Sequence, residues 1–175
     1  RQWQAWGVSA KAVLGHSLGE ISAATAAGLW SLDDAAKLVA KRGLLMSSDL
    51  ARGGMCSVKL PVAEVCAHLE ATGASIEVAA VNGPNSVVLA GAIEALSVTA
   101  EQLKMQGAEV KALNIDVACH SRLLDPLLDE YREVLSGLQF RECHLPLIST
   151  VTGSTVDSAE LHDVEHWVQN LRGCV

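Results

Sequence analysis

The sequence predicts an α/β protein in which a small βαββαβ module interrupts a larger core. A strand, a tight turn and an Ala-rich helix follow one another over residues 10–29, which is the pattern of an α/β core. Residues 54–115 then alternate between strands and helices in an order of their own. Half of the 175 residues are hydrophobic and 19% are charged, which is enough apolar material for a buried core and excludes a disordered chain.

Composition also excludes several classes of protein. The 13 Lys and Arg residues against 20 Asp and Glu residues give a net charge of −7 without a basic run, which argues against nucleic-acid binding. The apolar stretches are too short to span a membrane and no leader pattern is seen, so we expect a cytoplasmic protein. The five cysteines lack the close pairs of a zinc site or a disulfide framework, so we expect reduced thiols and no metal.

The first part of the core contains three helices and a strand. Residues 1–6 are expected to form the end of a helix, and the apolar run Ala10–Leu14 between two glycines predicts a buried strand. The Ala-rich stretch Leu18–Leu29 predicts a helix. Ser31 is a favourable N-cap for the next predicted helix, Leu32–Met46.

The module has six predicted elements. In order, they are the strand Met55–Leu60, the helix Val62–Glu70, the strands Ile76–Val81 and Val87–Ala90 around the turn Asn82-Gly83-Pro84-Asn85, the helix Ile93–Met105 and the strand Val110–Ile115. The order βαββαβ is that of a ferredoxin-like module, which we assign to residues 54–115. The core then comprises residues 1–53 and 116–175, and we expect it to be incomplete at both ends.

Three further elements complete the core. Asp125-Pro126 predicts the N-cap and the first turn of a helix that ends near Leu135. Pro146–Thr150 predicts a short strand, and Leu161–Leu171 predicts the last helix.

Ser17 lies where the first strand meets the first helix. The segment Gly15-His16-Ser17-Leu18-Gly19-Glu20 has the G-x-S-x-G pattern in its strand–turn–helix context. Glycines two residues before and two after the serine avoid clashes in a strained turn that exposes the hydroxyl, and the helix N-terminus favours a developing oxyanion. We therefore predict that Ser17 is a nucleophile; the alternative is a chance glycine-rich turn.

Two other residues carry chemistry. A nucleophilic serine needs a base, and of the six histidines His120 lies on a loop after a predicted strand, where catalytic groups often gather. Arg42 has only apolar neighbours on its helix face, so its guanidinium requires an anion. That anion is either a protein carboxylate such as Glu20 or a carboxylate of the substrate, which Arg binds in bidentate fashion.

Several segments together resemble the malonyl-CoA:acyl-carrier-protein transacylases, and above all the acyltransferase domains of modular polyketide synthases. The matching segments are Trp3–Val8, Gly15–Glu20, Lys41–Met46, Ala80–Pro84, Cys119–Ser121 with Asp125-Pro126, and His166–Leu171, in the order and spacing of that family. The resemblance implies a hydrolase-like α/β core with a short parallel sheet, carrying a ferredoxin-like subdomain.

The resemblance also implies roles for single residues. Ser17 resembles the serine that accepts the acyl group, His120 its base, and Arg42 the arginine that pairs with the free carboxylate of malonate. His16 and Leu18 match positions beside the nucleophile, and the N–H of Leu18 would help to bind the oxyanion.

The resemblance further implies the substrates and partners. No cofactor is bound; the acyl group would come from malonyl-CoA or methylmalonyl-CoA. It would pass to the phosphopantetheine thiol of an acyl carrier protein, beside a neighbouring ketosynthase domain, in polyketide or fatty acid biosynthesis. Neither nucleic acid nor a membrane takes part.

Three positions bear on the acyl pocket. Val117-Ala118-Cys119-His120 is neither the His-Ala-Phe-His form of malonyl enzymes nor the Tyr-Ala-Ser-His form of methylmalonyl enzymes, and Cys119 is too small to block an α-methyl group. Leu18 matches the malonyl form, where methylmalonyl enzymes usually have Gln, and because Leu18 directly follows the nucleophile we favour malonyl. Asn82 falls in the family's subdomain motif and is expected to help shape the cleft.

Two other functions fit part of the sequence. A serine esterase or lipase of the α/β-hydrolase class needs an acid between serine and histidine, for which Asp116 is available, but it has no use for Arg42. A degenerate domain that only docks a carrier protein needs no catalytic residue. The family's upstream glutamine motif and the downstream segment that orients the histidine are not among these residues, so the 175 residues alone are not expected to form a complete enzyme.

Overall fold

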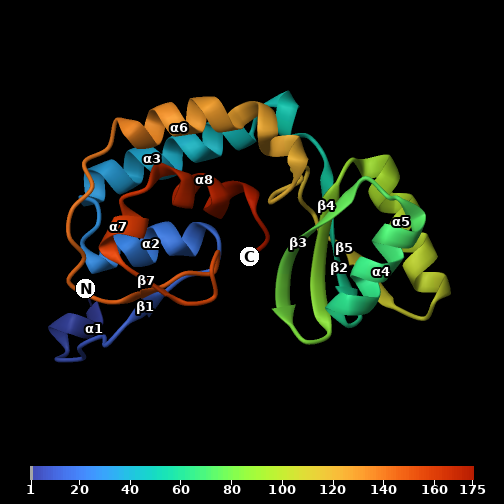
Figure 1. Cartoon of the computed structure of the whole chain (residues 1–175), viewed down its shortest axis with the longest axis horizontal. Coiled ribbons are helices and arrows are strands. Elements are labelled where there is room, and N and C mark those ends of the chain that lie inside the picture. Colours follow the sequence, from blue (N-terminus) through green and yellow to red (C-terminus); the bar gives the residue numbers. More distant parts are fainter. Residues whose placement is uncertain (1) are drawn as a thin grey trace.

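The computed structural model describes residues 2–175. Figure 1 shows two lobes: a helical lobe, residues 2–51 and 122–172, built from both ends of the chain, and a sheet lobe, residues 54–112, built from its middle. The helix end expected at residues 1–6 is α1 (Gln2–Ala5), and Arg1 lies outside the described residues. Within residues 2–175, no helix is both long and apolar enough to cross a bilayer.

The helical lobe contains a three-stranded sheet in the order β1-β6-β7. β1 (Val13–Leu14) pairs in parallel with β6 (Leu147–Ile148), which confirms a short parallel pairing in the core. Both strands are shorter than the expected 10–14 and 146–150. The sequence pattern does not predict β7 (Thr155–Val156), which pairs antiparallel with β6 and makes the sheet mixed. Two residues are too few to show the alternation that marks a strand.

Two helices follow β1. α2 (Leu18–Ala27) ends two residues earlier than expected, because Gly28 adopts the left-handed conformation, φ 100°, that caps it. α3 (Leu32–Met46) has the predicted bounds, and the Ser31 hydroxyl accepts a hydrogen bond from the N–H of Asp34, as expected of an N-cap. The buried residues of α3 are Ala35, Leu38, Arg42 and Leu45. A short 3-10 turn, η1 (Asp49–Ala51), leads to the sheet lobe.

The helix expected after Asp125-Pro126 begins differently. A 3-10 turn, η2 (Arg122–Leu127), contains Pro126 and runs into α6 (Leu128–Ser136). The cap is Ser121 and not Asp125, since the Ser121 hydroxyl accepts from the N–H of Leu123. The expectation that Asp125 caps this helix is therefore wrong, because the turn starts four residues earlier.

The last expected helix, residues 161–171, is α8 (Val164–Arg172), which begins three residues later than expected because a separate short helix ends at Leu161. This short helix, α7 (Ser158–Leu161), ends before Asp163, whose carboxylate accepts from the N–H of Glu165 and starts α8. Trp167 on α8 packs against Trp30, with ring centroids 4.4 Å apart, in the core of the helical lobe. This packing fixes α8 beside α2 and α6 (Figure 1).

The sheet lobe contains the six predicted elements in the predicted order. They are β2 (Gly54–Lys59), α4 (Val62–Thr72), β3 (Ile76–Gly83), β4 (Ser86–Gly91), α5 (Ile93–Met105) and β5 (Glu109–Ala112). The strands lie in the order β3-β4-β2-β5 and all their pairings are antiparallel. β5 stops at Ala112, three residues before the expected end. Both helices cover one face of the sheet, where Val65, Leu96 and Leu103 pack on the strands (Figure 1).

The opposite face of this sheet turns toward the helical lobe. Its small residues Ala79 and Ala90 pack with Ala118, which lies on the segment that returns from β5. The outgoing and returning segments are paired: the N–H of Gly53 donates to the carbonyl of Asp116 over 3.0 Å. A Cβ at Gly53 would lie 2.7 Å from the Cβ of Ala118, so this close crossing requires glycine.

A second connection between the lobes lies at the end of α8. Arg172 pairs with Glu77 of β3, with Nη2 and Oε1 3.0 Å apart. Beyond it, Val175 exchanges two backbone hydrogen bonds with β3, to Ala79 and Val81. The end of α8 is thus held against the sheet lobe, and the turn after β1 lies close to both.

Candidate active site

Ser17 occupies a strained turn between β1 and α2. Its φ of 53° and ψ of −114° are rare for a residue with a side chain, so the surroundings must hold this conformation. Gly15 permits the turn, since a Cβ there would lie 1.9 Å from the carbonyl oxygen of Gly19. A Cβ on Gly19 would meet no atom within 4 Å, so the expectation of a steric need for glycine is right at Gly15 and wrong at Gly19.

The hydroxyl of Ser17 meets His120. Ser17 Oγ lies 2.7 Å from His120 Nε2, although 103 positions separate the two residues. His120 lies between β5 and η2, has a φ of 57° and is buried. Burial, together with the positive charge of Arg42, lowers the pKa of His120 to about 4. The imidazole is therefore neutral at pH 7, and its Nε2 can accept the proton of Ser17.

Arg42 reaches the same hydroxyl from α3. Its Nη2 donates to Ser17 Oγ over 3.1 Å, and only 5% of the residue is exposed. Burial lowers the pKa of Arg42. Within residues 2–175, no Asp or Glu forms an ion pair with this guanidinium, and its Nε has no hydrogen-bond partner. The site thus holds a buried cation that has no acidic partner among residues 2–175.

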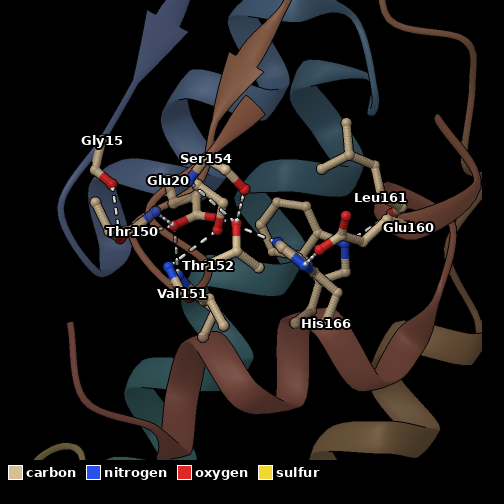
Figure 2. Close-up of polar contacts among 12 residues, drawn as sticks. Gly15, Glu20, Thr150, Val151, Thr152, Ser154, Glu160, Leu161 and His166 are labelled. Carbon is tan, nitrogen blue, oxygen red and sulfur yellow. Dashed lines mark hydrogen bonds and ion pairs between the residues drawn. The ribbon is translucent and has the colours of Figure 1, made fainter. Parts of the chain in front are cut away.

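Glu20 is not the anion of Arg42. Its fully buried carboxylate accepts from the backbone N–H and the hydroxyl of Thr150, at 3.0 and 2.8 Å, and from His166 Nε2 at 3.1 Å (Figure 2). It also accepts from Asn170 Nδ2 at 3.3 Å. Burial by itself raises the pKa of Glu20, but hydrogen bonds from His166, Ser149 and Thr150 outweigh it and hold the pKa below its usual value. The alternative that Glu20 neutralises Arg42 is therefore wrong, because the Glu20 carboxylate is bound by Thr150, His166 and Asn170.

His16 and Asn82 meet across the two lobes. His16 Nε2 lies 3.2 Å from Asn82 Oδ1, and both side chains are exposed. Asn82, near the end of β3, is thus brought against the Ser17 turn itself. Leu18 is the first residue of α2, so its N–H has no partner within the helix, and its side chain is 42% exposed. The backbone N–H of Leu18 is therefore free to donate to a group bound at Ser17, and its side chain is accessible to such a group.

Cys119 lies next to His120 and is half-buried. Burial raises the pKa of its thiol, while the charge of Arg42 acts in the opposite direction to a smaller extent. The thiol is therefore protonated at neutral pH. A small, neutral side chain occupies this position.

Sequence reasoning assigned no role to Thr150, His166 or Asn170, all of which contact Glu20. Asn170 Nδ2 also donates to the backbone carbonyl of Ser17 over 3.3 Å. The sequence contained one signal for two of them. His166 and Asn170 are four residues apart, so they lie on the same face of α8, and both are buried there.

A large cavity lies away from Ser17. Its volume is about 680 Å³, and it is formed between β2, α5 and the segment after β5, with Met55, Leu96 and Ile115 in its walls. None of the residues around Ser17 lines it, so cavity size does not mark the site. Within residues 2–175, no cluster of three His, Cys, Asp or Glu side chains is placed to hold a metal ion.

Comparison with known proteins gives one consistent result. The family model for the acyl transferase domain matches residues 1–175. The polyketide synthase GfsB of Streptomyces halstedii is 42% identical over 167 residues, an alignment that covers 95% of this chain and 3% of GfsB. This chain therefore spans only a small part of the length of such a relative.

Solved structures agree in fold. The acyltransferase domain from the second module of the salinomycin polyketide synthase superposes with a TM-score of 0.90 at 40% identity, covering 98% of this chain and 40% of that one. The acyltransferase domain of SpnD, solved in complex with 2-(pent-4-yn-1-yl)malonyl, has a TM-score of 0.92 at 34% identity, covering 98% and 41%. Since the family model covers the whole chain and both structures superpose over nearly all of it, the chain belongs to the acyl transferase domain family.

Proposed function

We propose that this chain transfers a malonyl-type acyl group from CoA, through an ester on Ser17, to the phosphopantetheine thiol of an acyl carrier protein. One observation carries the proposal. A buried guanidinium, that of Arg42, lies 3.1 Å from a serine hydroxyl that is itself 2.7 Å from the neutral imidazole of His120. A hydroxyl with a base suits acyl transfer, and a buried cation beside it suits an acyl group that ends in a carboxylate.

The first half-reaction loads the serine. His120 Nε2 accepts the proton of Ser17 while Oγ attacks the thioester carbonyl of the acyl-CoA. The N–H of Leu18, at the positive end of α2, stabilises the tetrahedral oxyanion. Collapse of this intermediate breaks the C–S bond, and the departing CoA thiolate takes the proton from His120. The products are CoA and an ester on Ser17.

The second half-reaction unloads the serine. The carrier-protein thiol gives its proton to His120 and attacks the ester carbonyl. The Ser17 oxygen then leaves and takes that proton back, so the enzyme returns to its starting state. The neutral form of His120 at pH 7 suits both steps, because each begins with proton acceptance.

Arg42 selects the acyl group. Its planar guanidinium binds the distal carboxylate in bidentate fashion, which a Lys would not reproduce. Leu18 and Cys119 lie beside the acyl group, and we favour malonyl over methylmalonyl on the identity of Leu18. The complex of SpnD with a malonyl derivative supports an acyl group of this class.

We also propose a division of the fold. Residues 54–115 form a ferredoxin-like subdomain, and residues 1–53 and 116–175 form an α/β-hydrolase-like core. The strand order β3-β4-β2-β5 and the pairing of Gly53 with Asp116 support these boundaries. The subdomain would cover Ser17 and limit the entry of water to the ester. A ketosynthase neighbour and a carrier protein would be the partners, since the relatives are polyketide synthases.

An esterase is less well supported. Its triad would need a carboxylate on His120, but within residues 2–175 neither Asp116 nor any other acid pairs with that imidazole. An esterase would also leave Arg42 without an anion. A domain that only docks a carrier protein would not need the 2.7 Å contact of Ser17 with His120.

Mass spectrometry tests the proposal. The natural full-length protein is mixed with malonyl-CoA, and the mass added to the peptide containing Ser17 is measured. We expect a malonyl adduct that is absent in Ser17→Ala. Arg42→Ala should lose malonyl loading and keep acetyl loading, whereas Arg132→Ala, which removes a guanidinium paired with Glu165, should load malonyl normally. Turnover of malonyl-CoA without any adduct on Ser17 would contradict the proposal.

A further inference from the structure

A buried polar cluster ties the Ser17 turn to two other elements. It consists of Glu20 in the first turn of α2, Thr150 after β6, and His166 and Asn170 on α8; Figure 2 draws the contacts of Glu20 with Thr150 and His166. None of these side chains has a part in the reaction proposed above. A buried carboxylate is costly to keep, so its surroundings call for an explanation.

Glu20 is the centre of this cluster. Its Oε1 accepts from His166, and its Oε2 accepts twice from Thr150 and once from Asn170. On its other side, His166 Nδ1 lies 3.6 Å from Glu160 Oε1, so the imidazole is held between two carboxylates (Figure 2). The Glu20 carboxylate therefore has a fixed orientation. Its two oxygens in turn fix the orientation of the side chains that donate to them.

Two of those donors also reach the backbone of the turn. Asn170 Nδ2 lies 3.3 Å from Glu20 Oε2 and 3.3 Å from the Ser17 carbonyl, so one amide group serves both acceptors. The Thr150 hydroxyl has one hydrogen and lies 2.8 Å from Glu20 Oε2 and 3.3 Å from the carbonyl of Gly15, so its main hydrogen bond is to Glu20 and the Gly15 carbonyl receives a weaker share of the same hydrogen. The carbonyls on both sides of the strained turn are thus contacted by side chains that Glu20 orients.

We propose that Glu20, acting through Asn170 and Thr150, is a positioning residue for the nucleophile. By orienting these two donors it holds Ser17 in its strained, positive-φ conformation and keeps Ser17 Oγ aligned with His120 Nε2. His166 keeps the carboxylate from rotating away. The inference rests on the proposed function, since it takes Ser17 as the nucleophile.

Single-turnover kinetics on the natural full-length protein test this role. The variants are Glu20→Gln, which keeps the shape and replaces one acceptor by a donor, and Asn170→Asp, which places an acceptor against the Ser17 carbonyl. For each we expect the rate constant for acylation of Ser17 by malonyl-CoA to fall about 10- to 100-fold, the cost of a misplaced reacting group. The KM for malonyl-CoA should change less than about twofold, because neither residue touches the substrate.

Glu165→Gln is the matched control. It removes the same charge from an exposed position on α8 that pairs with Arg132 and has no contact with the turn. We expect its rate constant to equal that of the wild type.

A milder pair of variants covers the case in which Glu20→Gln does not fold. Thr150→Val removes only the hydroxyl, and Thr150→Ser retains it. Thr150→Val should slow acylation several-fold, and Thr150→Ser should restore the wild-type rate constant.

The kinetic readout separates positioning from stability. A merely structural role would lower the amplitude of the acylation burst, which counts folded molecules, and leave the rate constant unchanged; that result would overturn the inference. Wild-type rate constants in Glu20→Gln or Thr150→Val would overturn it too. If the wild-type protein acquires no acyl group on Ser17, the proposed function itself fails, which is a different and recognisable result.

Discussion

The guanidinium of Arg42, on α3, and the hydroxyl of Ser17, in the turn before α2, lie 3.1 Å apart although the two residues are 25 positions apart in the chain. The guanidinium is buried and has no acidic partner within residues 2–175, so in the proposed reaction it would bind the arriving carboxylate without first breaking an ion pair. Burial lowers the pKa of His120, and the positive charge of Arg42 lowers it further. In the proposed reaction, Arg42 would therefore link substrate selection to the pKa of the base.

Arg42→Lys tests the geometry of anion binding. Lys keeps the charge but offers a single point of contact in place of two parallel hydrogen bonds, and charge-assisted hydrogen bonds contribute about 1.5–3 kcal/mol. We expect kcat/KM for malonyl-CoA to fall about 10- to 100-fold, while that for acetyl-CoA stays within about threefold of the wild type. Equal losses with both donors would show that Arg42 does not recognise the distal carboxylate.

The fall of kcat/KM at acidic pH measures the pKa of His120. Its pKa lies at about 4 in the folded protein, below the ordinary 6.5, so the base form persists at pH values where a free imidazole is protonated. With acetyl-CoA, whose acyl group does not titrate, kcat/KM should stay level from pH 7 to about 5 and fall at lower pH. Arg42→Ala should shift this fall to higher pH, still below 6.5 because burial remains. A wild-type fall at 6.5 would contradict this.

The same shift predicts a loss of stability in acid. Between pH 6.5 and 4 the unfolded chain binds a proton at His120 and the folded chain does not, so the free energy of unfolding decreases as the pH falls through this range. His120→Gln removes the titrating group. Urea titrations at several pH values should show a shallower pH dependence for the variant than for the wild type.

Gly15 and Gly19 form a matched pair for the turn. A Cβ at residue 15 would lie 1.9 Å from the carbonyl of Gly19, so Gly15→Ala should lower the free energy of unfolding by about 3 kcal/mol or more, as overpacking against backbone does. Gly19→Ala adds a methyl group to open space on α2 and should stabilise the protein by up to about 1 kcal/mol. Denaturant unfolding of both variants measures the difference, and equal effects would contradict the close approach at Gly15.

The contact of His16 with Asn82 predicts an effect on the fate of the acyl group. This exposed hydrogen bond joins the turn to the sheet lobe, so its loss should let the two separate more easily and admit water. We expect Asn82→Ala to raise the ratio of hydrolysis to transfer of the Ser17 ester. The increase should be several-fold and below about tenfold, because only one exposed hydrogen bond is lost. Asn85→Ala, on the neighbouring β3–β4 turn, is the control and should hydrolyse as the wild type does.

Much of the fold follows from local patterns. The bounds of α3 and α5 were predictable because Ser31 caps the first and a regular apolar spacing marks both. The βαββαβ order over residues 54–112 was predictable because each strand there is long enough to show its pattern. β7 and the division between α7 and α8 were not, since strands of two residues and a cap within a helical pattern leave little local signal.

By itself, the sequence determined which residue types stand at the strand–helix turn, that Arg42 must find an anion, and that the chain resembles the acyltransferases. It left open whether that anion is Glu20, because burial and pairing depend on residues more than a hundred positions away. Only the tertiary structure decided this, by bringing Thr150, His166 and Asn170 onto Glu20. Distances of a few ångströms govern hydrogen bonds and charges, and only folding brings such distant groups within that range.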